Sequence, residues 1–155
     1  VRIRQESAYA PNGVPVRTLQ ETLAASRRES TVVRYSDRTA KWNRIEGDKE
    51  TSGEVKLGDG LPWADGSQFW VLRSAPRPNT SEPVYTFDMA QRRWVLTTNT
   101  YRGKVDLKIG SRSVRAHKIE TSRSGVQGAM WLDEAGTPLM FEFGDLRIEQ
   151  REEKQ

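Results

Sequence analysis

Apolar and polar residues alternate with a period of two along most of the chain, and residues 105–109 form the clearest run. Successive side chains of a strand point to opposite faces of a sheet, so such alternation predicts β-strands. Gly136 and Pro138 lie between two of these segments and favour a turn there, because glycine adopts positive φ easily and proline is tolerated at the first residue of a strand. In the second half of the chain, strands are expected from residue 85 onward and at residues 94–101, 105–109, 114–121, 126–132, 139–143 and 146–148.

The first half of the chain predicts a meander of strands. Residues 1–8 and 14–16 flank Asn12-Gly13, a dipeptide that is typical of hairpin turns. Residues 38–45 and 54–57 predict two further strands, which end before a Gly-Asp-Gly turn. These strands are joined by short turns, so we expect them to pair in antiparallel fashion.

Residues 16–30 fit two structures. Leu19 and Leu23 have the i, i+4 spacing of a helix, whereas the segment follows a hairpin turn and leads into the β-branched and aromatic residues 31–35. We favour a strand, because its neighbours on both sides are predicted to be strands.

Residues 61–79 differ in character from the rest of the chain. Asp65 is a candidate N-cap, Phe69 and Leu72 lie three residues apart on one side of a helix, and two prolines follow from Pro76 onward. This pattern predicts one short helix or loop around residues 65–75, which would plug an open sheet.

Composition favours a thin core. Only 35% of the 155 residues are hydrophobic and 30% are charged, which suits one curved sheet with a solvated outer face. The predicted fold is therefore mainly β, a single curved antiparallel sheet that forms a half-barrel or open barrel around the short helix or loop. We expect residues 1–155 to form one antiparallel β-domain.

Few residues offer catalytic or metal-binding chemistry. The chain has no cysteine, and His117 is its only histidine, which we interpret as an ordinary sheet residue. Asp48, Asp59 and Asp65 lie near glycines, but their spacing does not match a calcium-binding loop, so turn formation is the favoured role. We predict that the protein is not an enzyme and needs no metal or cofactor.

The net charge of +4 comes from 25 basic and 21 acidic residues that are spread along the chain. This dispersion argues against nucleic acid as a partner, because nucleic-acid-binding proteins concentrate their basic residues. No apolar run approaches the length of a membrane-spanning helix, and the chain begins at Val1 rather than Met, so we expect a segment to have preceded it. A solvated sheet edge is favoured over a site for anionic headgroups at the basic residues of one predicted hairpin, Arg112, Arg115, Lys118 and Arg123.

Large apolar side chains near the predicted helix and its return strand are candidates for a pocket that would hold an apolar ligand. They are Trp63, Phe69, Trp70, Leu72, Phe87 and Trp94. The same side chains would supply buried area to a chain with few aliphatic residues, and this core interpretation is the favoured one.

Five short motifs follow one another in the second part of the chain, at residues 69–73, 85–88, 101–104, 114–119 and 131–133. In order and spacing they resemble a family of uncharacterised bacterial cell-envelope proteins whose folds are similar to the half-barrel of lipoprotein carriers. The resemblance covers roughly residues 60–150 and implies a curved sheet around a helical plug, an acyl or other lipid-like ligand, and a periplasmic or otherwise exported location. It implies no catalytic residues, and this chain lacks the cysteine of a lipid-anchoring motif.

The sequence hypothesis is a non-catalytic binding or interaction module of the cell envelope, in its sharper form one that binds a hydrophobic or lipid-like ligand. The alternative is a structural subunit or scaffold of a larger assembly, in which sheet edges and residues 1–8 pair with another envelope protein or with a second copy of the chain.

Overall fold

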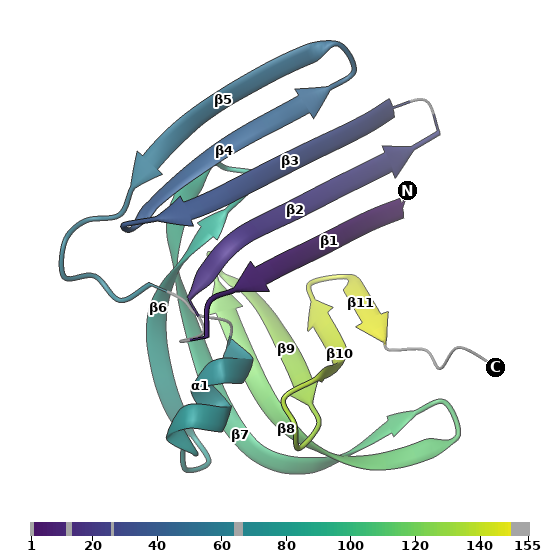
Figure 1. The fold of residues 1–155 in the computed structure, drawn as a ribbon. Helices are drawn as coiled ribbons and strands as arrows, with labels where there is room; N and C mark the ends of the chain where they lie inside the picture. The colour runs from purple at the N-terminus through teal and green to yellow at the C-terminus, as the bar shows by residue number, and fades with distance from the viewer. Residues whose placement is uncertain (1, 12–13, 26, 64–66, 150–155) are drawn as a thin grey trace. The chain divides into compact units, whose positions relative to one another are not determined.

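The computed structural model describes residues 2–11, 14–25, 27–63 and 67–149, without the side chains of residues 67–69 (Figure 1). This part of the chain is mainly β, with antiparallel strand pairing and one short helix, which confirms the predicted fold class. The strands lie in two antiparallel sheets, one of five and one of six strands, rather than in the single sheet predicted from the sequence. Neither sheet closes into a barrel.

The elements follow one another along the chain as hairpin-connected strands, interrupted once by the helix (Figure 1). Their bounds are β1 Arg2–Tyr9, β2 Pro15–Ala24, β3 Arg27–Ser36, β4 Thr39–Glu46, β5 Lys49–Lys56, α1 Ser67–Ser74, β6 Thr80–Asp88, β7 Arg93–Ile109, β8 Arg112–Arg123, β9 Val126–Leu132, β10 Pro138–Phe143 and β11 Leu146–Glu149. The five-stranded sheet has the order β1-β2-β3-β4-β5, and the six-stranded sheet has the order β11-β10-β9-β8-β7-β6.

The chain forms two compact units. The first unit consists of residues 1–65 and 85–95, and the second unit consists of residues 66–84 and 96–155. The first unit therefore contains strands β1–β5, and the second contains α1 and strands β8–β11, while β6 and β7 contribute residues to both.

The first unit confirms the predicted hairpins. Strand β1 pairs with β2, and the backbone N–H of Ala10 donates to the carbonyl of Val14 over 2.8 Å at the connection. Asn12-Gly13, the predicted turn, lies outside the described residues. The segment 16–30 fitted either a helix or a strand, and a strand was favoured. Residues 16–24 lie in β2 and residues 27–30 lie in β3, so the segment is β-structure but contributes to two strands.

Strand β5 is longer than its predicted range of residues 54–57. It begins at Lys49, which pairs with Glu46 across a tight turn at Gly47, where φ is +58°. The residues between Lys49 and Glu54 are polar and exposed, so they lack the apolar alternation by which a half-buried strand is recognised.

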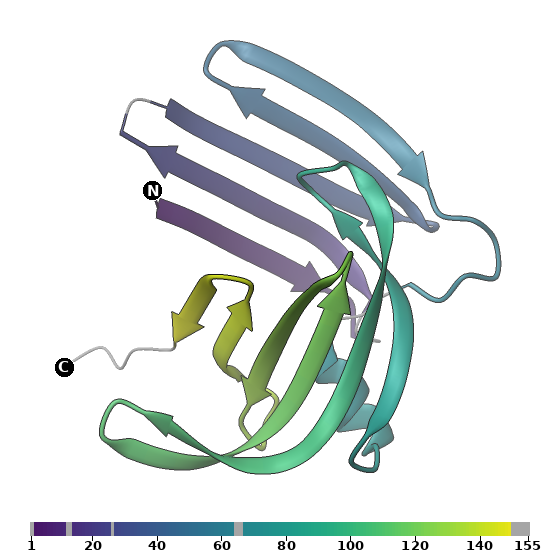
Figure 2. The same cartoon turned by 180° about the vertical axis from the view of Figure 1, so that it is seen from behind.

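The helix of the second unit lies within the predicted range of residues 65–75, and Asp65, the predicted N-cap, lies outside the described residues. Trp70 and Val71 of α1 pack on one face of the sheet against Tyr101, Ile119 and Leu132. Figure 2 shows the green strands of this sheet as long, strongly bent ribbons.

Strand β7 continues through Gly103, where a β-bulge shifts its register against β8. Gly103 has φ +93°, a conformation that favours glycine. One extra residue in a strand sends the following side chains to the other face, so Tyr101 and Leu107 face opposite sides although both numbers are odd. Leu107 accordingly packs into a separate buried cluster, with Ala116, Ala129, Trp131 and Met140.

Candidate functional site

Four aromatic rings from separate segments meet in the first unit. The ring of Trp94 lies 5.8 Å from that of Trp63, 5.6 Å from that of Phe87 and 6.2 Å from that of Tyr35, measured between centroids. The Trp63–Trp94 and Phe87–Trp94 pairs are edge-to-face, with interplanar angles of 87° and 74°. We call these four residues the aromatic cluster. Such geometry suits the quadrupoles of the rings.

The loop before Trp63 is held by the turn between β3 and β4. Arg38, in that turn, donates from its guanidinium to the carbonyls of Gly58 and Leu61, and its own carbonyl accepts the N–H of Leu57 over 2.8 Å. A parallel bridge then joins Trp63 to Tyr85 of β6. These contacts bring Trp63 to β6 and β7, although it is 31 residues from Trp94 in the chain.

One polar atom of the aromatic cluster has its hydrogen-bond partner in the neighbouring strand β5. The indole N–H of Trp94 donates to the carbonyl of Val55 over 3.0 Å, and burial raises the pKa of the Tyr35 hydroxyl. Phe87 is buried, whereas Trp63, Trp94 and Tyr35 are half-buried. The cluster therefore serves as core on the Phe87 side and offers accessible ring surface at the two tryptophans.

Three of the six predicted pocket residues, Trp63, Phe87 and Trp94, thus come together, while the other three belong to the helix of the second unit. Trp70 is core, with 5% exposure. Leu72 is 46% exposed. The side chain of Phe69 lies outside the described residues.

His117 belongs to a polar cluster of the second unit that the sequence did not reveal. Its Nδ1 lies 2.8 Å from the hydroxyl of Tyr101, and its Nε2 lies 3.5 Å from Glu134, which also accepts from the Lys104 ammonium over 2.7 Å. The bond from Lys104 lowers the pKa of Glu134, and burial raises the pKa of Tyr101. This polar cluster ties the loop between β9 and β10 to β7 and β8, and Tyr101 occupies one nitrogen of the ring.

Metal chemistry finds no support in the described part of the chain, where no three His, Cys, Asp or Glu side chains are grouped to hold an ion.

The predicted basic group at β8 does not form one surface. Alternation puts Arg115 and Arg123 on one face and Arg112 and Lys118 on the other. Arg115 pairs with Asp106 over 3.0 Å, and the Lys118 ammonium pairs with Glu120 over 2.9 Å.

A stronger concentration of positive charge lies on one face of the five-stranded sheet, which we call the basic face. The strand register puts seven basic and four acidic side chains of the described residues on it, an excess of three, whereas the whole chain has an excess of four. The basic side chains are those of Arg2, Arg4, Arg17, Arg28, Arg34, Lys41 and Lys56, and the acidic ones are those of Glu6, Glu21, Glu50 and Glu54.

The basic face also carries a depression of about 340 Å³, lined by Arg28, Ser30, Ile45 and Gly47. Two aliphatic side chains of this region are exposed, Ile45 in the lining at 47% and Leu23 beside it at 44%.

No helix in the described residues has the length and apolar character needed to cross a bilayer.

Comparison with known proteins assigns no relative: no protein family, no curated protein and no solved structure matches this chain.

Proposed function

We propose that the protein is a non-catalytic binding or interaction module of the bacterial cell envelope. The observation that carries the proposal is the five-stranded sheet, whose buried apolar residues gather at one end of one face, around Val33 and Ala40. Away from that end the sheet exposes aliphatic side chains on both faces, Ile3 at 55% on one and Ile45 at 47% on the other. Exposed apolar side chains are typical of an interaction site where several gather on one face, as Leu23 and Ile45 do beside the depression of the basic face.

Further support for a non-catalytic role comes from His117, the only histidine. The hydroxyl of Tyr101 is hydrogen-bonded to its Nδ1, and the imidazole side chain is only 13% exposed. The envelope location rests on the resemblance of residues 60–150 to bacterial envelope proteins.

The aromatic cluster supports an apolar or lipid-like ligand as the sharper form of the proposal. Trp63 and Trp94 are half-buried and contact each other edge-to-face, so an acyl chain would pack against the ring surface that they leave accessible. We expect palmitic acid, used as a probe, to change the tryptophan fluorescence of the wild type. Trp94→Phe should reduce this response, and Trp131→Phe, in the core of the second unit, should retain it.

The edges of the sheet support the alternative, a subunit or scaffold of an assembly. Strands β1 and β5 are the two outer strands, and each has a hydrogen-bonded neighbour in this sheet on one side only. All eight residues of β1 are exposed. An outer strand of this length can pair with a strand of another molecule.

Native mass spectrometry of the protein purified gently from its own host separates these forms. A lipid-sized mass on a monomer would support the ligand-binding form, and an oligomer or larger complex without such a mass would support the subunit. A bare monomer that also leaves palmitic acid unbound would contradict both.

A further inference from the structure

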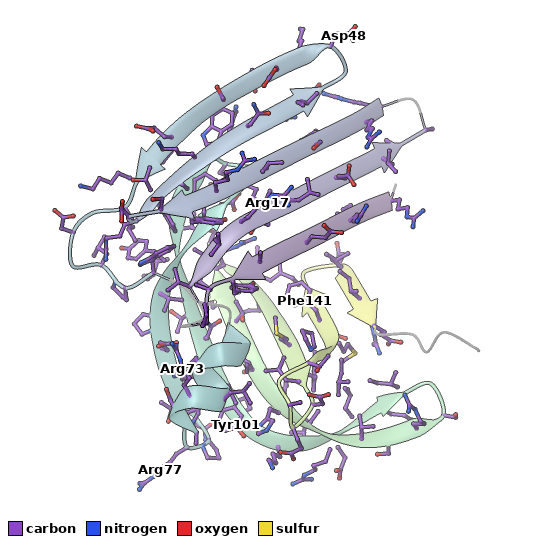
Figure 3. The ribbon with its side chains drawn as sticks, in the orientation of Figure 1. Arg17, Asp48, Arg73, Arg77, Tyr101 and Phe141 are labelled. Atoms are coloured by element: carbon purple, nitrogen blue, oxygen red, sulfur yellow. The ribbon has the colours of Figure 1, made fainter. Side chains whose placement is uncertain are left out.

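We propose that the basic face docks on the headgroups of an anionic lipid surface. The inference rests on the proposed role as a binding module and names its partner. It is carried by one row of side chains across three neighbouring strands, in which Arg17 of β2 pairs with Arg34 of β3 and Arg34 pairs with Lys41 of β4. Figure 3 labels Arg17 on β2.

This row places like charges directly opposite one another. Cross-strand neighbours lie about 5 Å apart, and like charges in that position destabilise a sheet. Arg17 and Arg34 are exposed, and neither has a side-chain hydrogen bond or ion pair within the described part of the structure. Only Lys41, at the end of the row, has a carboxylate partner, Glu54 at 3.7 Å. An external anion would compensate the two arginines.

Most of the other basic residues of the sheet have a carboxylate partner, and Arg2 and Lys49 are the exceptions among the described residues. On the opposite face, the Arg44 guanidinium donates to Glu29 over 3.0 Å and to Glu46 over 2.8 Å. On the basic face itself, Arg28 pairs with Glu21 over 3.0 Å. The Arg17–Arg34 pair is therefore a local departure from a matched pattern.

The neighbouring side chains favour a lipid surface over other anions. The next row of the basic face pairs Leu19 with Val32, and Leu23 and Ile45 are exposed farther along. A headgroup boundary accommodates cations together with aliphatic side chains. Single-stranded nucleic acid is instead held by stacking on aromatic rings, and the described residues of this face include none.

Flotation with lipid vesicles tests the inference. The wild type should bind vesicles that contain 30% phosphatidylglycerol in phosphatidylcholine, bind pure phosphatidylcholine vesicles far less, and lose binding as salt is added. The double variant Arg17→Gln/Arg34→Gln should bind the anionic vesicles about 30-fold more weakly, because each cation near an anionic surface contributes roughly a fivefold gain.

The matched control is Arg77→Gln/Lys108→Gln, which removes the same charge from two exposed positions outside the five-stranded sheet (Figure 3 labels Arg77). It should retain most of the binding, and circular dichroism should show that both variants are folded. Equal losses in the two variants, equal binding to both kinds of vesicle, or tighter binding to single-stranded DNA than to anionic vesicles would overturn the inference. A protein that fails on vesicles but carries a co-purified lipid or forms an assembly overturns this inference alone, and the proposed function stands.

Discussion

The two sheets use the same alternation of apolar and polar residues to different ends. In the six-stranded sheet, apolar clusters lie on both faces, around Ile119 on one and Trp131 on the other. In the five-stranded sheet, the buried cluster lies on one face and at one end. One sheet therefore has buried apolar side chains on both faces, whereas the other buries them at one end of one face only.

The bulge at Gly103 explains how one strand serves two clusters. Before the bulge, Tyr101 faces the helix side, and after it Leu107 faces the other side. Strand β3 of the five-stranded sheet has a regular register. Val33 and Tyr35 therefore stay on the face that packs against Phe87 and Trp94, while Arg34 stays on the basic face.

The largest expected effect separates the two sheets by stability. Trp131→Ala removes a side chain that is 8% exposed and should cost about 3–5 kcal/mol in the free energy of unfolding, measured with urea. Ile45→Ala, at 47% exposure in the five-stranded sheet, should change it by less than about 0.5 kcal/mol. Similar losses in both variants would contradict the comparison.

The second effect concerns the bulge. Gly103→Ala puts a Cβ on a residue with φ +93°, 3.4 Å from Cγ of Pro78, and should cost about 1–3 kcal/mol in thermal unfolding. Gly58→Ala is the matched control in the first unit, because its new Cβ would meet only the Leu61 side chain, at 3.4 Å. If Gly103→Ala melts like the wild type, the bulge does not depend on glycine.

Sequence alternation was sufficient to predict the strands of the second half, and the spacing of Phe69 and Leu72 before two prolines predicted the position of the helix. Alternation failed at Gly103, because a glycine after an apolar run suggests a turn, whereas here it keeps β7 continuous. It also could not divide the strands between two sheets, since alternation shows that a strand is half-buried but not which other strand covers it. The segment from Lys49 to Glu54 gave no signal for a different reason, because all its residues are exposed and it has no apolar alternation.

The candidate site depended on contacts between distant residues. Trp63 meets Trp94 through the Arg38 contacts and the bridge to Tyr85, and no local pattern encodes these. The Arg17–Arg34 pair follows from simple counting along the sequence once the β2–β3 turn has been placed. Ala24 pairs with Arg27 beside the β2–β3 turn, and counting outward from that pair brings Arg17 opposite Arg34.

The third effect tests the basic face through its apolar side chains. Leu23→Ser/Ile45→Ser should leave the melting temperature nearly unchanged, because both side chains are largely exposed. It should weaken binding to anionic vesicles about fivefold, which corresponds to roughly 1 kcal/mol of lost apolar burial. Leu96→Ser, at 50% exposure in the second unit, is the control and should bind normally. Unchanged binding of the double variant would leave charge as the only attraction.

The smallest effect compares matched with unmatched charges. Lys118 and Arg102 bond Glu120 over 2.9 and 2.7 Å and lower its pKa from the ordinary 4.5. A carboxyl whose pKa is lower in the folded than in the unfolded protein stabilises the folded state at pH values above its unfolded-state pKa. This contribution is lost as the pH falls through the folded-state pKa. Glu120→Gln should therefore lower stability by less than about 1 kcal/mol at pH 7, and the deficit should shrink below pH 4.5.

Arg34→Gln provides the opposite case in the five-stranded sheet. Arg34 lies between Arg17 and Lys41 and has no carboxylate partner among the described residues, so its removal relieves repulsion. We expect this variant to melt at or slightly above the wild-type temperature at low salt, and the difference to disappear in 1 M salt, where charges are screened. A lower melting temperature would mean that Arg34 stabilises the sheet. The row of Arg17, Arg34 and Lys41 would then contribute to the stability of the sheet by itself, and it would not need an external anion.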